Sequence, residues 1–216
     1  MSAAVYALPA ILDGKQLFVS AGLPLALFIV FAETGLLLGF FLPGDSLLFA
    51  AGYAASGGLG PKVHPNVVLV CVAMSIVAFV GAEVGYLIGR KAGPELFDKP
   101  DSRLFKASYV TKAREVLDSY GEPKAIILAR FVPVVRTFLN PLAGTVGVPL
   151  RTFTLWNAVG ALLWGTGVVL LGYYLGQVSV IGKNLEVFAA LVVLISVIPI
   201  AREILKQRRR TDRVPD

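Results

Sequence analysis

Long apolar stretches separated by short polar ones dominate this chain. A helix that crosses a bilayer needs about 20 consecutive, mostly apolar residues. The stretch 65–89 meets that length with a single acid, and the stretch 152–177 meets it without a charge. A shorter apolar run ends in basic residues near position 206. We therefore predict spanning helices over 65–89, 152–177 and 185–204.

Two further apolar regions, 17–56 and 125–150, are interrupted by helix-breaking residues. The first is long enough for two helical arms, and its centre cannot continue a regular helix. It forms either two spans with a tight turn, or a re-entrant hairpin or broken helix. The second is too punctuated for one straight span. The expected breakers are proline or glycine: Pro43, Gly44, Pro133, Pro141 and Gly144.

The polar segment 90–124 holds eight Lys and Arg residues. We predict a short surface helix within it, ended by Gly121. One face of this helix is expected to carry Val110, Ala113, Val116 and Tyr120. The pattern thus predicts one membrane domain over 17–204, an N-terminal segment 1–16 and a basic cytoplasmic tail 205–216.

The two halves of the domain resemble each other. Three short motifs recur in the same order: Phe41-Leu42-Pro43 with Phe131-Val132-Pro133, Ala51-Gly52 with Ala143-Gly144, and Gly85-Tyr86-Leu87-Ile88-Gly89 with Gly172-Tyr173-Tyr174-Leu175-Gly176. Three ordered matches are evidence of a duplication. Broken segments at matching positions of two halves are the best sequence pointer to a transporter site.

Charge sets the expected orientation. Cytoplasmic loops carry an excess of Lys and Arg, so 90–124 and the C-terminus are placed in the cytoplasm. Helix 65–89 then runs inward, and helix 152–177 runs outward if the region 125–150 dips into the membrane and returns. The predicted fold is an all-α polytopic membrane protein. It is an inverted-topology repeat with two opposed re-entrant hairpins plus spanning helices.

Composition supports a membrane protein and argues against other classes. The 216 residues are 56% hydrophobic and 16% charged, against roughly 25% charged in soluble domains. The net charge of +6 is explained by cytoplasmic loops, so nucleic acid is not an expected partner. With one cysteine and one histidine, neither a disulfide nor a metal site is expected. No catalytic motif is present, so neither an enzyme nor a cofactor is predicted.

Ionisable residues inside apolar segments are the candidate functional residues. They are Glu33, Asp45, Glu83, Arg130 and Arg136. Each costs at least about 2.5 kcal/mol at the centre of a lone spanning helix. Such groups must pair, face a cavity or lose their charge. They are either structural ion pairs between hairpins or a functional site, and the second is favoured because all but Glu83 lie in the broken segments.

The chemistry of these residues suits anion transport. Arginine offers forked donors that match phosphate or carboxylate, so Arg130 and Arg136 are predicted to bind an anionic head group. A carboxyl group in a low-dielectric cavity takes up a proton more readily than one in water. Glu33 and Asp45 are therefore assigned to proton coupling or charge balance. Glu83, nearer the cytoplasmic end of its helix, is a weaker candidate for that role.

Three motifs in order resemble the DedA family, whose members carry the VTT (SNARE-associated) domain. They are Glu33 followed by Gly39-Phe40-Phe41-Leu42-Pro43-Gly44-Asp45, then Gly81-Ala82-Glu83-Val84-Gly85-Tyr86-Leu87-Ile88-Gly89-Arg90, then Ala129-Arg130-Phe131-Val132-Pro133-Val134-Val135-Arg136-Thr137-Phe138. The resemblance covers about residues 20–180. Glu83 stands where the family usually has aspartate.

The resemblance implies opposed re-entrant hairpins, an inner-membrane location and dependence on the proton-motive force. It also implies transport of lipid phosphates, notably undecaprenyl phosphate, and its eukaryotic relatives behave as phospholipid scramblases. By matching positions, the essential residues would be Glu33, Asp45, Arg130 and Arg136.

The leading hypothesis is a multi-pass inner-membrane translocase, or flippase, of lipid phosphates such as undecaprenyl phosphate or phospholipids. Its partners would be membrane lipids and protons, and a homo-oligomer is left open. One alternative is a proton-coupled carrier of a small ion or osmolyte. Another is a non-transporting scaffold for envelope maintenance or division.

Overall fold

The computed structural model describes residues 14–36, 44–60, 63–97 and 107–177. All of its regular secondary structure is helical, which confirms the all-α class. The helices are α2 (Gly14–Gly35), α3 (Gly44–Ala55), α4 (Val67–Phe97), α5 (Ala107–Tyr120), α6 (Glu122–Ala129), α7 (Pro133–Thr145) and α8 (Leu150–Gly176). The predicted span 185–204, the tail 205–216, residues 1–13 and Pro43 lie outside the described residues.

Two helices, α4 and α8, are long and apolar enough to cross a membrane, over Val67–Gly93 and Leu150–Gly176. They correspond to the predicted spans 65–89 and 152–177. Helix α4 continues to Phe97, beyond the predicted end at Gly89. The basic residues that begin at Arg90 do not stop it, because Arg and Lys are good helix formers.

The outer faces of α4 and α8 are apolar. Large exposed side chains follow one face of each helix: Val68, Leu69, Val72, Ile76 and Val80 on α4, and Leu155, Leu162, Leu163 and Leu171 on α8. A soluble monomer rarely exposes a continuous apolar surface of this extent. The surface is that of a membrane protein whose solvent is lipid.

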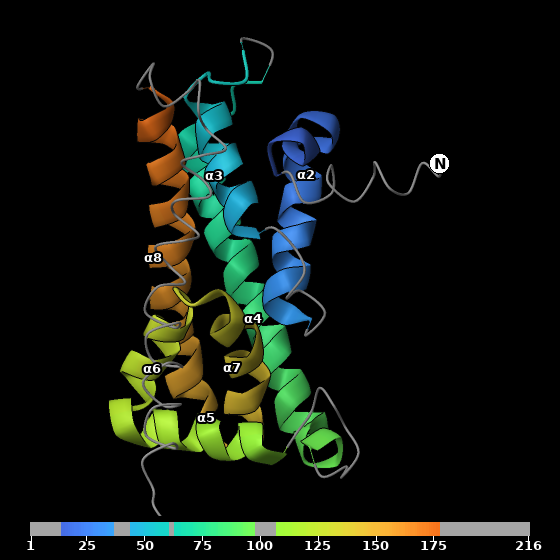
Figure 1. Cartoon of the computed structure of the whole chain (residues 1–216), viewed down its shortest axis with the longest axis vertical. Coiled ribbons are helices and arrows are strands. Elements are labelled where there is room, and N and C mark those ends of the chain that lie inside the picture. Colours follow the sequence, from blue (N-terminus) through green and yellow to red (C-terminus); the bar gives the residue numbers. More distant parts are fainter. Residues whose placement is uncertain (1–13, 37–43, 61–62, 98–106, 178–216) are drawn as a thin grey trace, which may run out of the picture.

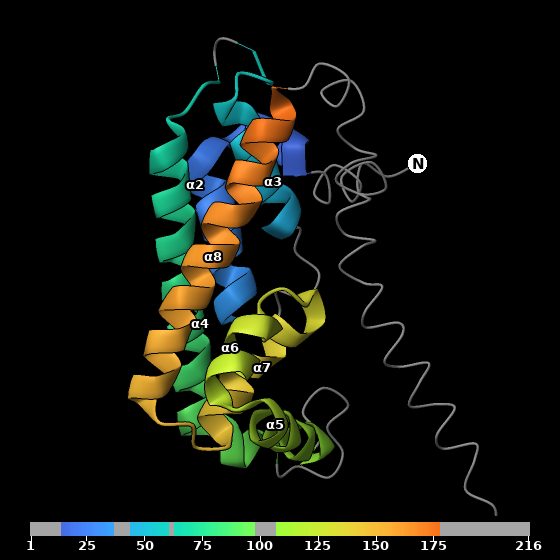
Figure 2. The same cartoon turned by 90° about the vertical axis from the view of Figure 1, so that its left-hand side faces the viewer.

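Two helix pairs occupy opposite ends of the long helices. In Figure 1, α2 and α3 lie beside the upper half of α4 and α8, and α6 and α7 lie beside the lower half. The lower ends of α2 and α3 lie toward the turn that joins α6 to α7, about midway along the bundle, and Figure 2 shows the same arrangement from the side.

One helix of each pair packs crosswise on a long helix. Helix α3 packs mainly on α8, and α7 mainly on α4. Glycines allow both approaches, since a Cβ at Gly52 would collide with the α8 backbone at Val169, and a Cβ at Gly144 would collide with the α4 backbone at Tyr86. Helices α3 and α7 are therefore each held by the long helix that lies farther away in sequence, whereas α2 packs on α4 and α6 on α8.

The predicted breakers in the second region need a correction. Pro141 and Gly144 lie inside α7 and do not interrupt it. The break falls at 130–132, immediately before Pro133. A bundle tolerates proline and glycine within a helix when neighbouring helices hold it in place. Here Gly144 provides close packing on α4 and does not form a turn.

Helix α5 confirms the predicted surface helix, and Gly121, with φ of 76°, separates it from α6. It crosses the lower end of the bundle in Figure 1. Of the four residues predicted to share a face, Ala113 is buried whereas Val116 and Tyr120 are exposed, and Leu117 is buried beside Ala113. Leu117 lies one turn beyond Ala113 and completes the packed face.

Replacing Gly144 with alanine is expected to destabilise the protein by roughly 1–3 kcal/mol, the usual cost of overpacking. The added methyl group would collide with the α4 backbone. Thermal unfolding in detergent measures the effect. Gly167→Ala is the matched control, because nothing lies within 4 Å of a Cβ there, and alanine should raise stability slightly through helix propensity. Equal melting temperatures for the two variants would contradict the close packing.

Candidate functional site

Arg136 joins the two helix pairs. It lies one turn into α7, is 5% exposed, and reaches two acids on the opposite pair. Its Nη1 donates to Asp45 Oδ1 on α3 at 2.6 Å, and its Nη2 donates to Glu33 Oε1 on α2. One guanidinium thus binds both helices of the other pair and brings these three charges together.

Trp164 on α8 completes this cluster. Its indole Nε1–H donates to Asp45 Oδ1 at 3.0 Å, and the Arg136 guanidinium lies 4.7 Å from the centroid of its ring. An arginine within about 6 Å of a tryptophan ring gains cation–π attraction. The side chain of Asp45 is 28% exposed and that of Glu33 only 3%, so Asp45 forms the accessible end of the cluster.

Two buried atoms in the cluster lack a hydrogen-bond partner within the described part of the chain: Glu33 Oε2 and Arg136 Nε. Buried polar atoms are usually satisfied, so the cluster can accept a further proton or ligand atom. Gly44 starts α3 directly against the Glu33 carboxylate, where a Cβ would collide with it. Gly44 therefore provides space for the acid as well as a helix start.

Arg130 belongs to a second cluster. It lies in the turn that joins α6 to α7 and is 4% exposed. One of its terminal nitrogens donates to the Ala78 carbonyl at 3.2 Å and to Asn157 Oδ1. Asn157 in turn donates to Glu83 Oε1 at 2.8 Å. Gly160 leaves room for the arginine side chain to lie against α8.

Glu83 is more central than its sequence position indicated. Its carboxylate accepts hydrogen bonds from Asn157 and, at 3.1 Å, from Thr154 Oγ1. It therefore connects to Arg130 through one amide and does not stand apart near the helix end.

The two arginines have different surroundings. Arg136 is neutralised by two carboxylates. Arg130 contacts neutral acceptors, and among residues 14–36, 44–60, 63–97 and 107–177 no carboxylate forms an ion pair with it. A buried guanidinium without a direct counterion is the group most ready to bind an anion.

Sequence reasoning missed Asn157, Thr154 and Trp164. All three lie in α8, within the predicted span 152–177, which carries no charge. The one sequence feature that could have pointed to them is Asn157, an amide in an apolar helix, because a buried amide needs hydrogen-bond partners. The acidic partners of these three residues lie more than 70 residues away, and Arg130 lies 27 residues from Asn157. Within the described ranges, no group of three or more His, Cys, Asp or Glu residues could hold a metal ion.

Replacing Asn157 with alanine is expected to cost roughly 1–3 kcal/mol, because it leaves buried charged groups without partners. Its effect and that of Glu83→Gln should be non-additive in a double-mutant cycle, as for residues of one network. Unfolding in detergent measures both. Thr166→Val on the same helix is the control, since among the described residues its hydroxyl makes only a long contact of 3.4 Å with Ser75. Strict additivity would show that the amide does not link the charges.

Comparisons with known proteins agree on one family. The profile of the VTT domain matches residues 42–174. Protein DedA of Escherichia coli (strain K12) is 42% identical over 186 residues, covering 86% of this chain and 83% of that protein. The uncharacterized membrane protein Rv0364 of Mycobacterium tuberculosis (strain H37Rv) is 44% identical over 205 residues, covering 92% and 88%. No solved structure gives a significant match.

Proposed function

This chain belongs to the DedA family of VTT-domain membrane proteins, and on that premise we propose that it translocates lipid phosphates across the inner membrane. The observation that supports this most is Arg130, a buried guanidinium without a direct counterion among the described residues. It lies in the turn that joins α6 to α7, and in Figure 1 this turn lies about midway along the bundle.

We further propose that both helix pairs are re-entrant hairpins. The apolar part of α2, Gly22–Gly35, is too short to cross a bilayer, and so are α3, α6 and α7 with 12, 8 and 13 residues. A crossing needs about 20 residues. A pair of such helices that enters from one side must return to it. The crosswise packing of α3 on α8 and of α7 on α4 supports an inverted repeat.

The charges suggest how the site works. Arg130 binds the phosphate through its forked donors. Glu33 and Asp45 balance Arg136 while the site is empty. A proton on Glu33 weakens its hold on Arg136 and frees a second guanidinium for the same phosphate. Proton uptake and lipid binding then favour each other, which links transport to the proton-motive force.

The orientation proposed from charge puts α5 and the C-terminus in the cytoplasm. Cysteine labelling tests it in a Cys71→Ala background. Ser119→Cys on the exposed face of α5 should resist an impermeant reagent added to intact cells, and His64→Cys, exposed at the other end of α4, should react. Lysed cells provide the control in which both react. The reverse pattern would invert the topology.

A second candidate is a proton-coupled carrier of a small anion. The observation that favours it is the enclosure of Arg130, which is only 4% exposed. A small anion, which has no hydrocarbon chain to accommodate, could fit beside this enclosed guanidinium.

Flux into liposomes tests these proposals. Purified protein is reconstituted, and translocation of labelled undecaprenyl phosphate is measured with and without a pH gradient, beside labelled inorganic phosphate. Lipid-phosphate flux that rises with the gradient and is lost in Arg130→Gln supports the translocase. Flux of inorganic phosphate alone would establish the small-anion carrier. Absence of any flux, from protein that stays folded, would favour a scaffold.

A further inference from the structure

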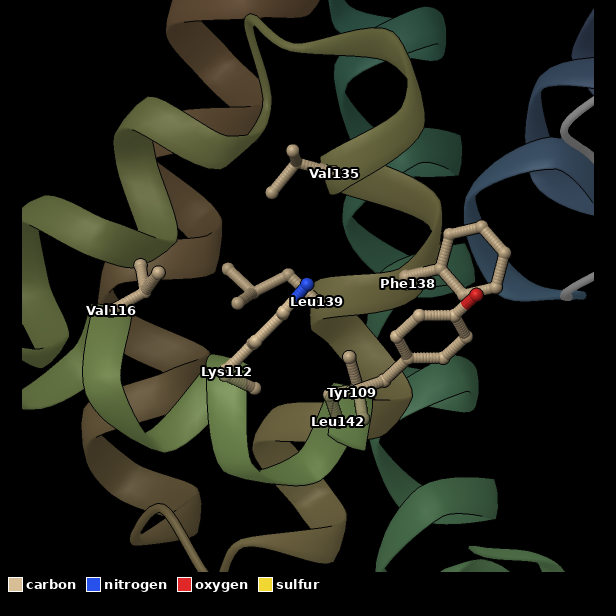
Figure 3. Close-up of a pocket in the computed structure, with 8 residues that line it drawn as sticks. Tyr109, Lys112, Val116, Val135, Phe138, Leu139 and Leu142 are labelled. Atoms are coloured by element: carbon tan, nitrogen blue, oxygen red, sulfur yellow. The ribbon is translucent and has the colours of Figure 1, made fainter. Parts of the chain in front are cut away.

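An apolar groove of about 320 Å³ lies between α5 and α7. Figure 3 shows Tyr109, Lys112 and Val116 of α5 facing Val135 and Leu139 of α7 across it. Small-molecule sites occupy roughly 300–1,000 Å³, so the groove has the size of a modest ligand site. It uses a different face of α7 from Arg136, which points to α2 and α3.

Lys112 gives the groove a charge. Its side chain extends from α5 toward α7 in Figure 3, and it is the cation among the residues that line the groove. Within the parts of the chain that the structure describes, no carboxylate forms an ion pair with its ammonium group. The remaining lining is apolar except for the Tyr109 hydroxyl. An apolar channel with one uncompensated cation complements a molecule with a hydrocarbon chain and an anionic end.

The groove lies at the end of the membrane-spanning helices, where molecules with a hydrocarbon chain and an anionic end are abundant. Helix α5 crosses the end of the membrane-spanning helices, as helices at the boundary between head groups and acyl chains do. Val116 and Val135, which line the groove, are 39% and 38% exposed, so the groove opens to the outside of the protein. A lipid can therefore slide in sideways, and a soluble ligand would have to leave water to do so.

We propose that this groove binds an anionic phospholipid from the leaflet on the α5 side. One acyl chain lies between α5 and α7, and the phosphate rests on the Lys112 ammonium. Lysine is a common partner of phosphate as a point charge, and its stem can pack on apolar surface while its head reaches the polar layer. The proposal rests on the membrane location and not on transport, so it can fail or succeed independently of the proposed function.

Native mass spectrometry of the full chain in detergent tests the proposal, with dioctanoyl phosphatidic acid as the probe. Lys112→Gln should weaken binding by about tenfold, as expected for loss of one charged hydrogen bond. Leu139→Trp, which fills the groove, should weaken it at least as much. Arg114→Gln is the matched control, because it removes the same charge from an exposed position of the same helix outside the groove.

Two further probes separate the contribution of the phosphate to binding from that of the acyl chains. Dioctanoylglycerol, which lacks the phosphate, should bind the parent and Lys112→Gln equally weakly, and glycerol 3-phosphate, which lacks the chains, should not bind. The proposal is overturned if Lys112→Gln retains the affinity of the parent, or if Arg114→Gln loses as much. Unchanged lipid binding in Leu139→Trp would show that another part of the chain, or a second copy, covers the groove, and would overturn it as well.

Discussion

Arg130→Lys is expected to insert and fold but to lose lipid-phosphate transport by roughly 10-fold to 150-fold, the equivalent of about 1.5–3 kcal/mol for a charge-assisted hydrogen bond. Lysine keeps the charge but lacks the planar fork that holds phosphate with two donors. Its single ammonium can still reach the Ala78 carbonyl or Asn157, the neutral acceptors that Arg130 uses. Folding should therefore survive while phosphate recognition fails.

Ligand-induced stabilisation provides a readout that does not depend on flux. A ligand at 100 times its Kd stabilises the folded state by about 2.7 kcal/mol. A lipid phosphate should raise the melting temperature of the parent and not that of Arg130→Lys. Full transport by Arg130→Lys, or equal stabilisation by the lipid, would show that Arg130 is structural.

Arg136→Lys is a less decisive experiment. Arg136 uses two separate nitrogens to hold Glu33 on α2 and Asp45 on α3. Lysine would lose one of these links whether the residue binds phosphate or only ties the helix pairs together. From the sequence, both arginines were given the same role. Their contacts differ, so only a substitution at Arg130 can distinguish a phosphate-binding role from a structural one.

Glu33→Gln is expected to produce the second large effect, a loss of roughly 3–5 kcal/mol of stability, as when one partner of a buried ion pair is removed. Glu33 is almost fully buried beside Arg136. Asp45→Asn should cost less, because Asp45 is partly exposed and solvent compensates for its charge. Chemical unfolding in detergent should place the two variants in that order.

Both amide variants should also lose the response of transport to a pH gradient, because an amide cannot exchange a proton. Flux is compared with and without a gradient in liposomes that contain equal amounts of folded protein. Glu115→Gln on the exposed side of α5 is the control for removing an acid. Wild-type flux that still follows the gradient in both amide variants would rule out proton coupling through Glu33 and Asp45.

The sequence predicted the helices well where length and hydropathy determine them. α4, α5 and α8 lie where the pattern put them. The points at which helices are interrupted were harder to predict, because proline and glycine occur both in turns and at closely packed positions within helices. Pro133 follows a turn, whereas Gly144 provides an interface with α4. The two uses look the same in one sequence.

The candidate charges were predictable because an ionisable residue in an apolar segment is costly. Their pairing was not predictable from position. Arg136 meets an acid 103 residues away, and Arg130 reaches Glu83 only through Asn157. An amide or an indole in an apolar span adds no formal charge, so Asn157 and Trp164 gave little signal until their partners were in place.

The crosswise packing has a consequence for biogenesis. Glu33 is synthesised 103 residues before Arg136, an interval of roughly 5–20 seconds at about 5–20 residues per second. The first helix pair, α2 and α3, must wait in the translocon or bilayer without the Arg136 counterion and without α8, the helix on which α3 packs. The N-terminal half alone should therefore be a substrate for quality-control proteases, and co-expression of the C-terminal half as a separate chain should rescue it.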